Sequence, residues 1–164
     1  LIDLNQYLLN LDKIVFYLNY NKYLSNYKAE GIFVCNNYRF AFDYQNYKTL
    51  KTKFIIPKKF YGKLLKNKKL TTLDYALNIG DKAFVIHENF CITKWPLAIA
   101  YALSFLIVAN VKKIYLIGFD GYLNDKKKNK EMNDIFKEYN RLIDKKEIIS
   151  ITKTKYRIAK KIIL

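Results

Sequence analysis

The chain has 164 residues, of which 51% are hydrophobic and 16% aromatic, and it carries a formal net charge of +16. This length is enough for one domain with a buried core, and the apolar content argues against intrinsic disorder. No apolar run reaches the roughly 18 residues that a membrane-spanning helix needs, and the start is too polar for a signal peptide, so we expect a cytoplasmic protein.

The positive charge favours anionic partners such as nucleotides, nucleic acids and acidic lipid headgroups. Lysine, asparagine, isoleucine and tyrosine are all frequent, and they share A/T-rich codons. An A/T-rich genome would therefore produce the positive charge without selection for nucleic-acid binding. The lysines are scattered except for the run at residues 126–130, which we expect on a solvated loop or helix start. Nucleic-acid binding is therefore not expected, whereas peripheral association with an acidic membrane surface stays open.

Two apolar runs in the first part of the chain each end in asparagine. Residues 13–18 and 32–35 are rich in β-branched and aromatic side chains, which is typical of buried strands. Asn19 and Asn36 follow them. A short amide at the carboxyl end of a strand can donate to and accept from a ligand, but it can equally cap the next helix.

Hydrophobic periodicity predicts further elements. Short helices are expected at residues 2–11 and 21–27. Residues 53–56 and 83–86 are predicted to be strands, the first of which is stopped by a proline. A helix-compatible patch covers residues 73–79, in the least decided part of the chain.

The single histidine and the two cysteines do not form a metal or catalytic motif. His87 follows a predicted strand, where a hydrogen-bonded structural histidine is commoner than a general base. No second His or Cys lies at metal-ligand spacing, so no zinc site is expected. Cys35 and Cys91 are too few for a disulfide framework and are expected to be reduced core residues.

The stretch over residues 91–122 is the most informative part of the chain. Thr93 is predicted to cap a buried, apolar helix over residues 97–109, with Pro96 at its first turn. Asn110 is expected to close this helix.

A strand is expected over residues 114–117, and a polar cluster follows it directly at Gly118, Asp120 and Tyr122. In open α/β sheets, ligands bind at the carboxyl ends of strands, beside the amino termini of helices. We therefore expect this cluster to share one edge of the sheet with the turn at Thr93. The alternative is a core helix and a core strand joined by an ordinary turn.

The rest of the chain predicts a helix over residues 130–142, capped by Asp125, and a last strand over residues 148–151. Strands alternate with helices, so we predict an α/β fold. It would be a Rossmann-like three-layer sandwich with a mostly parallel sheet and helices on both faces, formed as a single domain by residues 1–164. No paired nucleophile and base, Walker loop or Gly-x-Gly-x-x-Gly motif is visible.

The segment IYLIGFDGY, preceded by a helix and the turn CITKW, resembles a known family. It looks like the Rossmann-like domain at the C-terminus of bacterial HMG-CoA-lyase-like and hydroxy-oxovalerate-aldolase-like proteins of surface-polysaccharide clusters. The helix EMNDIFKEY and the segment SITKTKY also resemble it, although the family more usually has proline where Lys153 stands. The resemblance covers most of residues 1–160 and is strongest over residues 91–156.

That domain is similar in turn to the family-42 bacterial sialyltransferases, which bind CMP-sialic acid. Their pattern is strand-Asn, strand-Asn, a Thr-Ser-Gly turn before a helix, and Gly-x-Asp-x-Tyr after the next strand. The residues at matching positions here, with Lys94 in the place of the serine, are Asn19, Asn36, Thr93, Lys94, Gly118, Asp120 and Tyr122. The resemblance implies that they bind a CMP-sugar or other nucleotide sugar. It also implies that Tyr122 is the catalytic residue, which donates to the leaving phosphate, and that Lys94 can pair with that phosphate.

The resemblance has two gaps. The family's first strand and its Gly-x-Gly-Pro-Ser phosphate loop would precede Leu1, so we expect this chain to lack them. The histidine that serves the transferases as general base has no counterpart, because His87 lies before the motif. We therefore expect a nucleotide-sugar-binding, glycosyltransferase-like domain with no assigned base, cofactor or metal, acting in surface-glycan synthesis. The alternative is a non-catalytic accessory domain of an aldolase that binds or scaffolds a partner.

Overall fold

The structure is a computed structural model that describes residues 13–20, 29–65, 70–158 and 160–162. Its contacts divide the chain into two compact units. Lys13–Val108 forms one, here called the 13–108 unit, and Ala109–Leu164 belongs to the other, here called the 109–164 unit. The helices predicted at residues 2–11 and 21–27 lie outside the described residues.

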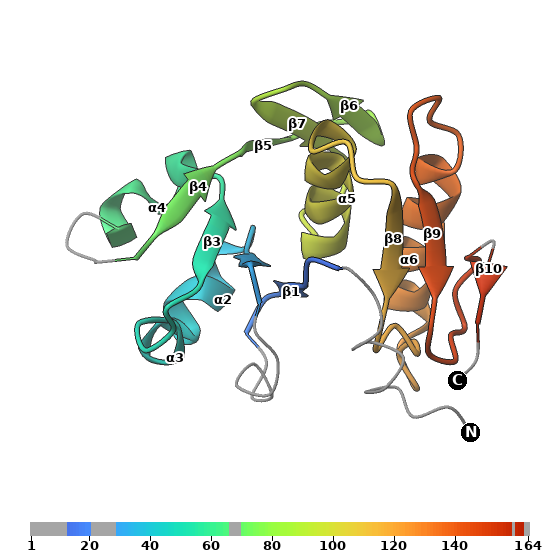
Figure 1. Cartoon of the computed structure of the whole chain (residues 1–164), viewed down its shortest axis with the longest axis horizontal. Helices are drawn as coiled ribbons and strands as arrows, with labels where there is room; N and C mark the ends of the chain where they lie inside the picture. The colour runs from blue at the N-terminus through green and yellow to red at the C-terminus, as the bar shows by residue number, and fades with distance from the viewer. Residues whose placement is uncertain (1–12, 21–28, 66–69, 159, 163–164) are drawn as a thin grey trace. The chain divides into compact units, whose positions relative to one another are not determined.

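The larger sheet of the 13–108 unit has four parallel strands in the order β1-β2-β3-β4 (Figure 1). They are β1 (Phe16–Leu18), β2 (Gly31–Phe33), β3 (Lys53–Ile56) and β4 (Thr72–Asp74). Three short helices connect them, namely α2 (Asn37–Phe42), α3 (Tyr44–Tyr47) and α4 (Lys58–Leu65). The predicted α/β class with mostly parallel pairing is confirmed, as are the strands expected at residues 13–18, 32–35 and 53–56.

A smaller sheet in the same unit has the order β5-β7-β6. Its strands are β5 (Ala76–Ile79), β6 (Phe84–Ile86) and β7 (Phe90–Thr93), and only the β6–β7 pair is antiparallel. The patch at residues 73–79, whose spacing is compatible with a helix, does not form one, because this segment forms β4 and β5. Leu73 pairs with Ile55 of β3 and Leu77 with Cys91 of β7, so pairing with distant strands overrides the local helical spacing.

Alternate residues of β2 pack into two different cores. Phe33 packs in a cluster with Ile55 and with Tyr101 of α5 (Ala98–Val108). Ile32 packs in a second cluster with Phe40 of α2, and other members come from α3, α4 and β3. Successive side chains of a strand point to opposite faces, so the two clusters lie on opposite faces of the larger sheet.

Helix α5 confirms the apolar helix expected at residues 97–109. Its residues 98–104 are all buried, which explains why alanine and leucine are favoured around the whole helix. The helix ends before Asn110, whose φ of +50° is the left-handed conformation that closes many helices. Asparagine adopts this conformation more readily than most residues, so the predicted end of the helix is confirmed.

The 109–164 unit contains a parallel sheet in the order β10-β9-β8. Its strands are β8 (Lys113–Leu116), β9 (Glu147–Ser150) and β10 (Lys160–Lys161). The first two confirm the strands expected at residues 114–117 and 148–151, whereas β10 was not expected. Helix α6 (Lys126–Tyr139) buries Met132, Ile135, Phe136 and Tyr139 on one face, as its periodicity predicted.

The predicted cap of α6 is confirmed, although the helix spans Lys126–Tyr139 and not residues 130–142. The Asp125 carboxylate accepts from the Lys128 N–H at 2.9 Å, and this hydrogen bond is the main reason why the pKa of Asp125 is lowered. The lysines of the 126–130 run lie in the exposed first turns of α6. None of the described helices is long and apolar enough to cross a membrane.

Candidate functional site

The seven predicted site residues are divided between the two units. Asn19, Asn36, Thr93 and Lys94 belong to the 13–108 unit, and Gly118, Asp120 and Tyr122 belong to the 109–164 unit. That all seven form one site stays a prediction.

Asn19 and Asn36 follow neighbouring parallel strands, so they lie at the same edge of the larger sheet. Asn19 has a φ of +60°, and its N–H donates to the Phe33 carbonyl oxygen at 2.9 Å. The Asn36 Oδ1 accepts from the Arg39 N–H at 2.9 Å and caps α2. The capping alternative is therefore confirmed for Asn36, while ligand binding by either amide stays a prediction.

Thr93 does not cap α5, so that prediction is wrong. It is the last residue of β7, it is fully buried, and its Oγ1 donates to a main-chain carbonyl oxygen two residues later at 2.6 Å. The helix begins only at Ala98, because the residue before Pro96 disfavours helical conformation. The N–H groups of residues 93–95 thus do not form the amino terminus of α5, and Lys94 is exposed on the turn that precedes it.

Gly118 and Asp120 line an open pocket of about 640 Å³ in the 109–164 unit, here called the β8–β9 pocket. Its lining residues are Ile117, Gly118, Asp120, Thr152, Lys153, Thr154 and Lys155. Leu116 of β8 pairs with Ser150 of β9 in parallel, so the loops after both strands leave the same edge of the sheet. Two predicted site residues thus share a concave surface at the strand ends where α/β proteins bind ligands.

The two loops that form the β8–β9 pocket are joined to each other. Three hydrogen bonds connect them: Gly118 N to Thr152 Oγ1 at 3.0 Å, Thr154 Oγ1 to Phe119 O at 2.5 Å, and Lys155 N to Asp120 O at 3.1 Å. The threonine side chains therefore connect the loops, whereas Lys153 and Lys155 alternate with them along the chain. These bonds restrict the backbone of the pocket.

Glycine is required at two positions of the loop after β8. Gly118 has a φ of +74° and Gly121 a φ of +105°, both in the region that side chains disfavour. At Gly121 a Cβ atom would also lie 3.1 Å from the Lys155 Cβ, so the lysine stem packs against this glycine. The Gly-x-Asp-Gly pattern of the sequence therefore has a conformational cause.

Tyr122 is not among the residues that line the β8–β9 pocket. Asn129 of α6 holds its backbone on both sides, since the Tyr122 N–H donates to Asn129 Oδ1 at 2.9 Å and the Tyr122 carbonyl accepts from Asn129 Nδ2 at 2.6 Å. The Lys128 ammonium lies 5.3 Å from the centroid of the tyrosine ring, a cation–π contact. Tyr122 is 45% exposed.

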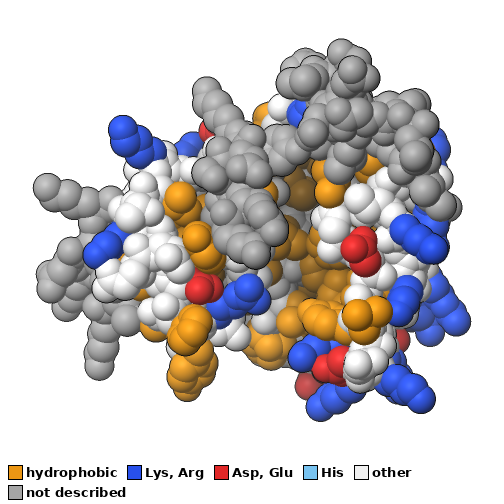
Figure 2. Space-filling model, turned by 90° about the horizontal axis from the view of Figure 1, so that it is seen from below, with side chains coloured by type: hydrophobic (Ala, Val, Ile, Leu, Met, Phe, Trp, Pro, Cys, Tyr) orange, Lys and Arg blue, Asp and Glu red, His pale blue; other side chains and the backbone are white. Residues whose placement is uncertain are grey.

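Positive charge exceeds negative charge around the β8–β9 pocket. Lys153 and Lys155 line it, and the Lys161 ammonium donates to the Thr154 carbonyl oxygen at 3.3 Å. Asp120 supplies the one carboxylate of the lining, so three lysines and one aspartate give a local charge of +2. Figure 2 views the molecule from below, the direction in which β8 and β9 point in Figure 1, and shows Lys and Arg side chains around the right-hand part of that face.

The two cysteines and the histidine of the chain have structural roles. Burial raises the pKa of Cys35 to about 12 and that of Cys91 to about 11, so both thiols stay protonated, as expected for core cysteines. The ring of His87 stacks on the Phe90 ring with 4.2 Å between centroids, and the His87 backbone N–H donates to the Phe90 carbonyl oxygen. Among the described residues, no group of His, Cys, Asp and Glu could hold a metal ion.

Sequence reasoning did not identify the half of the pocket formed by residues 152–155. The segment Thr-Lys-Thr-Lys follows a predicted strand directly, but the local pattern assigns it no ligand-binding role. Parallel pairing of the strands over residues 114–117 and 148–151 would have brought the two loops together. That pairing was the missing information.

A search of protein-family models, curated proteins and solved structures finds no match to this chain. The resemblance to the aldolase-associated domain and the sialyltransferases therefore stays a prediction.

Proposed function

We propose that the chain is a nucleotide- or nucleotide-sugar-binding domain of glycosyltransferase-like type that acts in bacterial surface-glycan synthesis. The observation that supports it best is the β8–β9 pocket, which lies at the carboxyl ends of two parallel strands. Its volume of about 640 Å³ suits a small-molecule ligand, and its local charge of +2 suits a phosphate-bearing one. Gly118 and Asp120, which the sequence pattern had singled out, line it.

If the domain is catalytic, the reaction is displacement at an anomeric carbon. The acceptor oxygen forms a bond to that carbon, and the bond from the carbon to the phosphate oxygen breaks with its electron pair moving to the phosphate. Tyr122 would donate to the leaving phosphate. We assign no residue of this chain as base for the acceptor proton, so ligand binding is the first property to measure.

Calorimetric titration with CMP, UDP, CDP and a CMP-sugar tests the proposal. At least one of them is expected to bind with one-to-one stoichiometry, and an Asp120→Ala variant is expected to change that affinity. Asp144→Ala is the matched control, since Asp144 is an exposed carboxylate in the loop before β9, at the other end of the strand. Absence of binding by all four compounds at millimolar concentration would contradict the proposal.

A second candidate is the non-catalytic accessory domain, and one feature of the 13–108 unit favours it. Tyr38 and Phe42 are 83% and 88% exposed, and they lie one turn apart on α2. Two large apolar side chains on one exposed helical face are typical of a partner-binding surface. This candidate predicts that Tyr122→Phe has no effect on the binding of any nucleotide, and that the reading frame upstream of Leu1 encodes an aldolase-like barrel.

A further inference from the structure

We infer that Lys153 and Lys155, in the loop after β9, bind the phosphate group of the ligand. The inference rests on the proposed function for the identity of that ligand, a nucleotide or nucleotide sugar. The resemblance to sialyltransferases assigned the phosphate to Tyr122 and Lys94. The β8–β9 pocket instead contains two lysines that the resemblance does not assign to ligand binding.

The backbone that carries the two lysines is fixed by hydrogen bonds to the loop after β8. Thr152 and Thr154 are bonded to the opposite loop through their hydroxyl groups, so the alternating lysines line the pocket together. Lys155 is fixed further, because its N–H donates to the Asp120 carbonyl and its stem packs against Gly121. A cation whose backbone and stem are already ordered loses less entropy when it binds an anion.

Lysines of the same unit differ in whether they pair with a carboxylate. Lys113 and Lys160 share the carboxylate of Glu147, at distances of 3.6 Å and 3.2 Å. By contrast, no ion pair between described residues involves Lys153 or Lys155. The lysines of the pocket thus keep their charge available for a ligand.

The charge and the apolar lining of the β8–β9 pocket match a ligand that carries a phosphate on a ring. With Lys161 and Asp120 included, the pocket has a local charge of +2, and a phosphomonoester carries a charge of about −2 at neutral pH. Lysine binds phosphate as a compact point charge, so two lysines can share one phosphate group. Ile117 lines the same pocket and is 42% exposed, so it offers an apolar contact to the ring that carries the phosphate.

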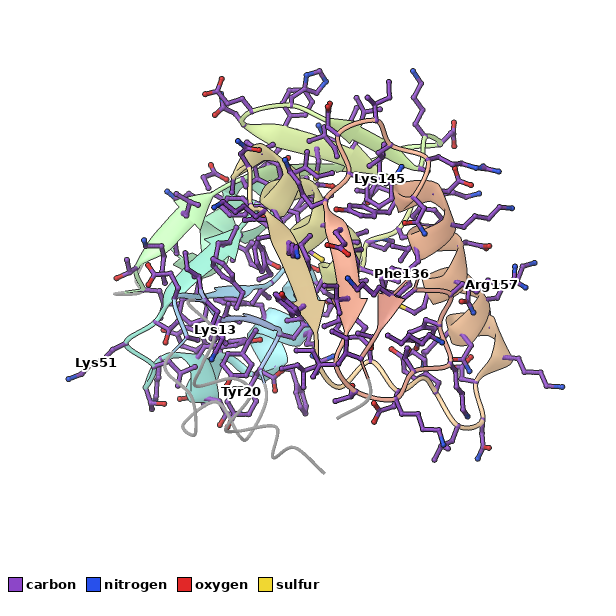
Figure 3. The ribbon with its side chains drawn as sticks, turned by 45° about the vertical axis from the view of Figure 1, so that its right-hand side comes forward. Lys13, Tyr20, Lys51, Phe136, Lys145 and Arg157 are labelled. Atoms are coloured by element: carbon purple, nitrogen blue, oxygen red, sulfur yellow. The ribbon has the colours of Figure 1, made fainter. Side chains whose placement is uncertain are left out.

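The test compares ligands with and without phosphate. CMP, cytidine, glucose 1-phosphate and inorganic pyrophosphate are titrated by calorimetry into the wild type and the Lys153→Gln, Lys155→Gln double variant. Loss of two charged contacts is expected to weaken CMP binding about tenfold or more, while cytidine binding stays unchanged. Lys145→Gln is the matched control, because Lys145 is an exposed lysine before β9, at the end of the sheet opposite the pocket (Figure 3).

The outcomes separate this inference from the proposed function. Equal CMP affinity of the double variant and the wild type would overturn the lysine assignment and leave nucleotide binding intact. Lysine-dependent binding of pyrophosphate or glucose 1-phosphate without binding of any nucleotide would support the phosphate site and contradict the proposed function. An unchanged melting temperature, and recovery of affinity in the Lys153→Arg, Lys155→Arg double variant, are expected if the effect is one of charge. Failure of every phosphate compound to bind the wild type would overturn both.

Discussion

Two buried tyrosines of the 13–108 unit provide a matched pair of substitutions that tests the packing of this core. Tyr47 and Tyr61 are both fully buried, and both rings pack on Phe40, with centroids 5.3 Å and 5.0 Å from its ring. Their hydroxyl groups differ. The Tyr47 hydroxyl accepts from the Tyr20 N–H at 2.7 Å, whereas the Tyr61 hydroxyl has no hydrogen-bond partner among the described residues.

The difference predicts unequal effects of the same substitution at the two positions. Tyr47→Phe leaves the half-buried Tyr20 N–H without its acceptor and is expected to lower the free energy of unfolding by about 1–2 kcal/mol. Tyr61→Phe removes a hydroxyl group whose burial is not compensated, so it is expected to be neutral or to stabilise by about 1 kcal/mol. Ring packing is kept in both variants, so the hydroxyl group is the only change.

Urea unfolding followed by circular dichroism measures both effects. The Tyr47→Phe midpoint should fall below that of the wild type, the Tyr61→Phe midpoint should equal or exceed it, and the slope of the unfolding free energy against urea concentration should stay unchanged. A loss of stability in Tyr61→Phe as large as that in Tyr47→Phe would show that the Tyr61 hydroxyl is hydrogen-bonded. The described arrangement of this core would then be refuted.

Two further predictions concern a loop conformation and the buried thiols. Gly121→Ala is expected to lower the free energy of unfolding by about 1–2 kcal/mol, because φ is +105° and the new Cβ meets Lys155 at 3.1 Å; a thermal melt equal to that of the wild type would contradict this. Burial raises the pKa of Cys35 to about 12 and of Cys91 to about 11 from the usual 9.0, so the unfolded chain loses these protons first. Their contribution to stability is complete below about pH 9 and is lost by about 1.4 kcal/mol per pH unit for each thiol as the pH rises toward the folded values. Urea midpoints between about pH 8 and 11 measure this loss. Replacing both cysteines with alanine should reduce the slope of stability against pH, and an unchanged slope would contradict the assignment of the loss to the two thiols.

Local patterns in the sequence were enough to predict the α/β class and many of its elements. A short apolar run bounded by polar residues identified β3 and β9, since burial in a parallel sheet requires apolar side chains on both faces. Apolar spacing of 3.6 residues and a capping carboxylate identified α6, because the buried face and the first turn are local properties of a helix. Gly118 and Asp120 were also predicted as site residues from local sequence, because they directly follow an apolar strand.

Other features depended on which strands pair. Residues 73–79 have helix-compatible spacing, yet β3 and β7 offer them partners that are distant in the sequence. Thr93 has the chemistry of a helix cap, but the strand pairing of β7 extends through it and Pro96 delays the helix. Neither outcome can be derived from a window of neighbouring residues.

The sequence by itself determined the alternation of strands and helices, the buried face of α6 and one loop of the β8–β9 pocket, because each depends on residues that are close along the chain. Tertiary structure decided the other loop. Lys153 and Lys155 join Asp120 only because β8 and β9 pair in parallel and end at the same edge, with three hydrogen bonds between their loops. The charge of the pocket therefore comes from residues more than thirty positions apart, which only the register of the sheet brings together.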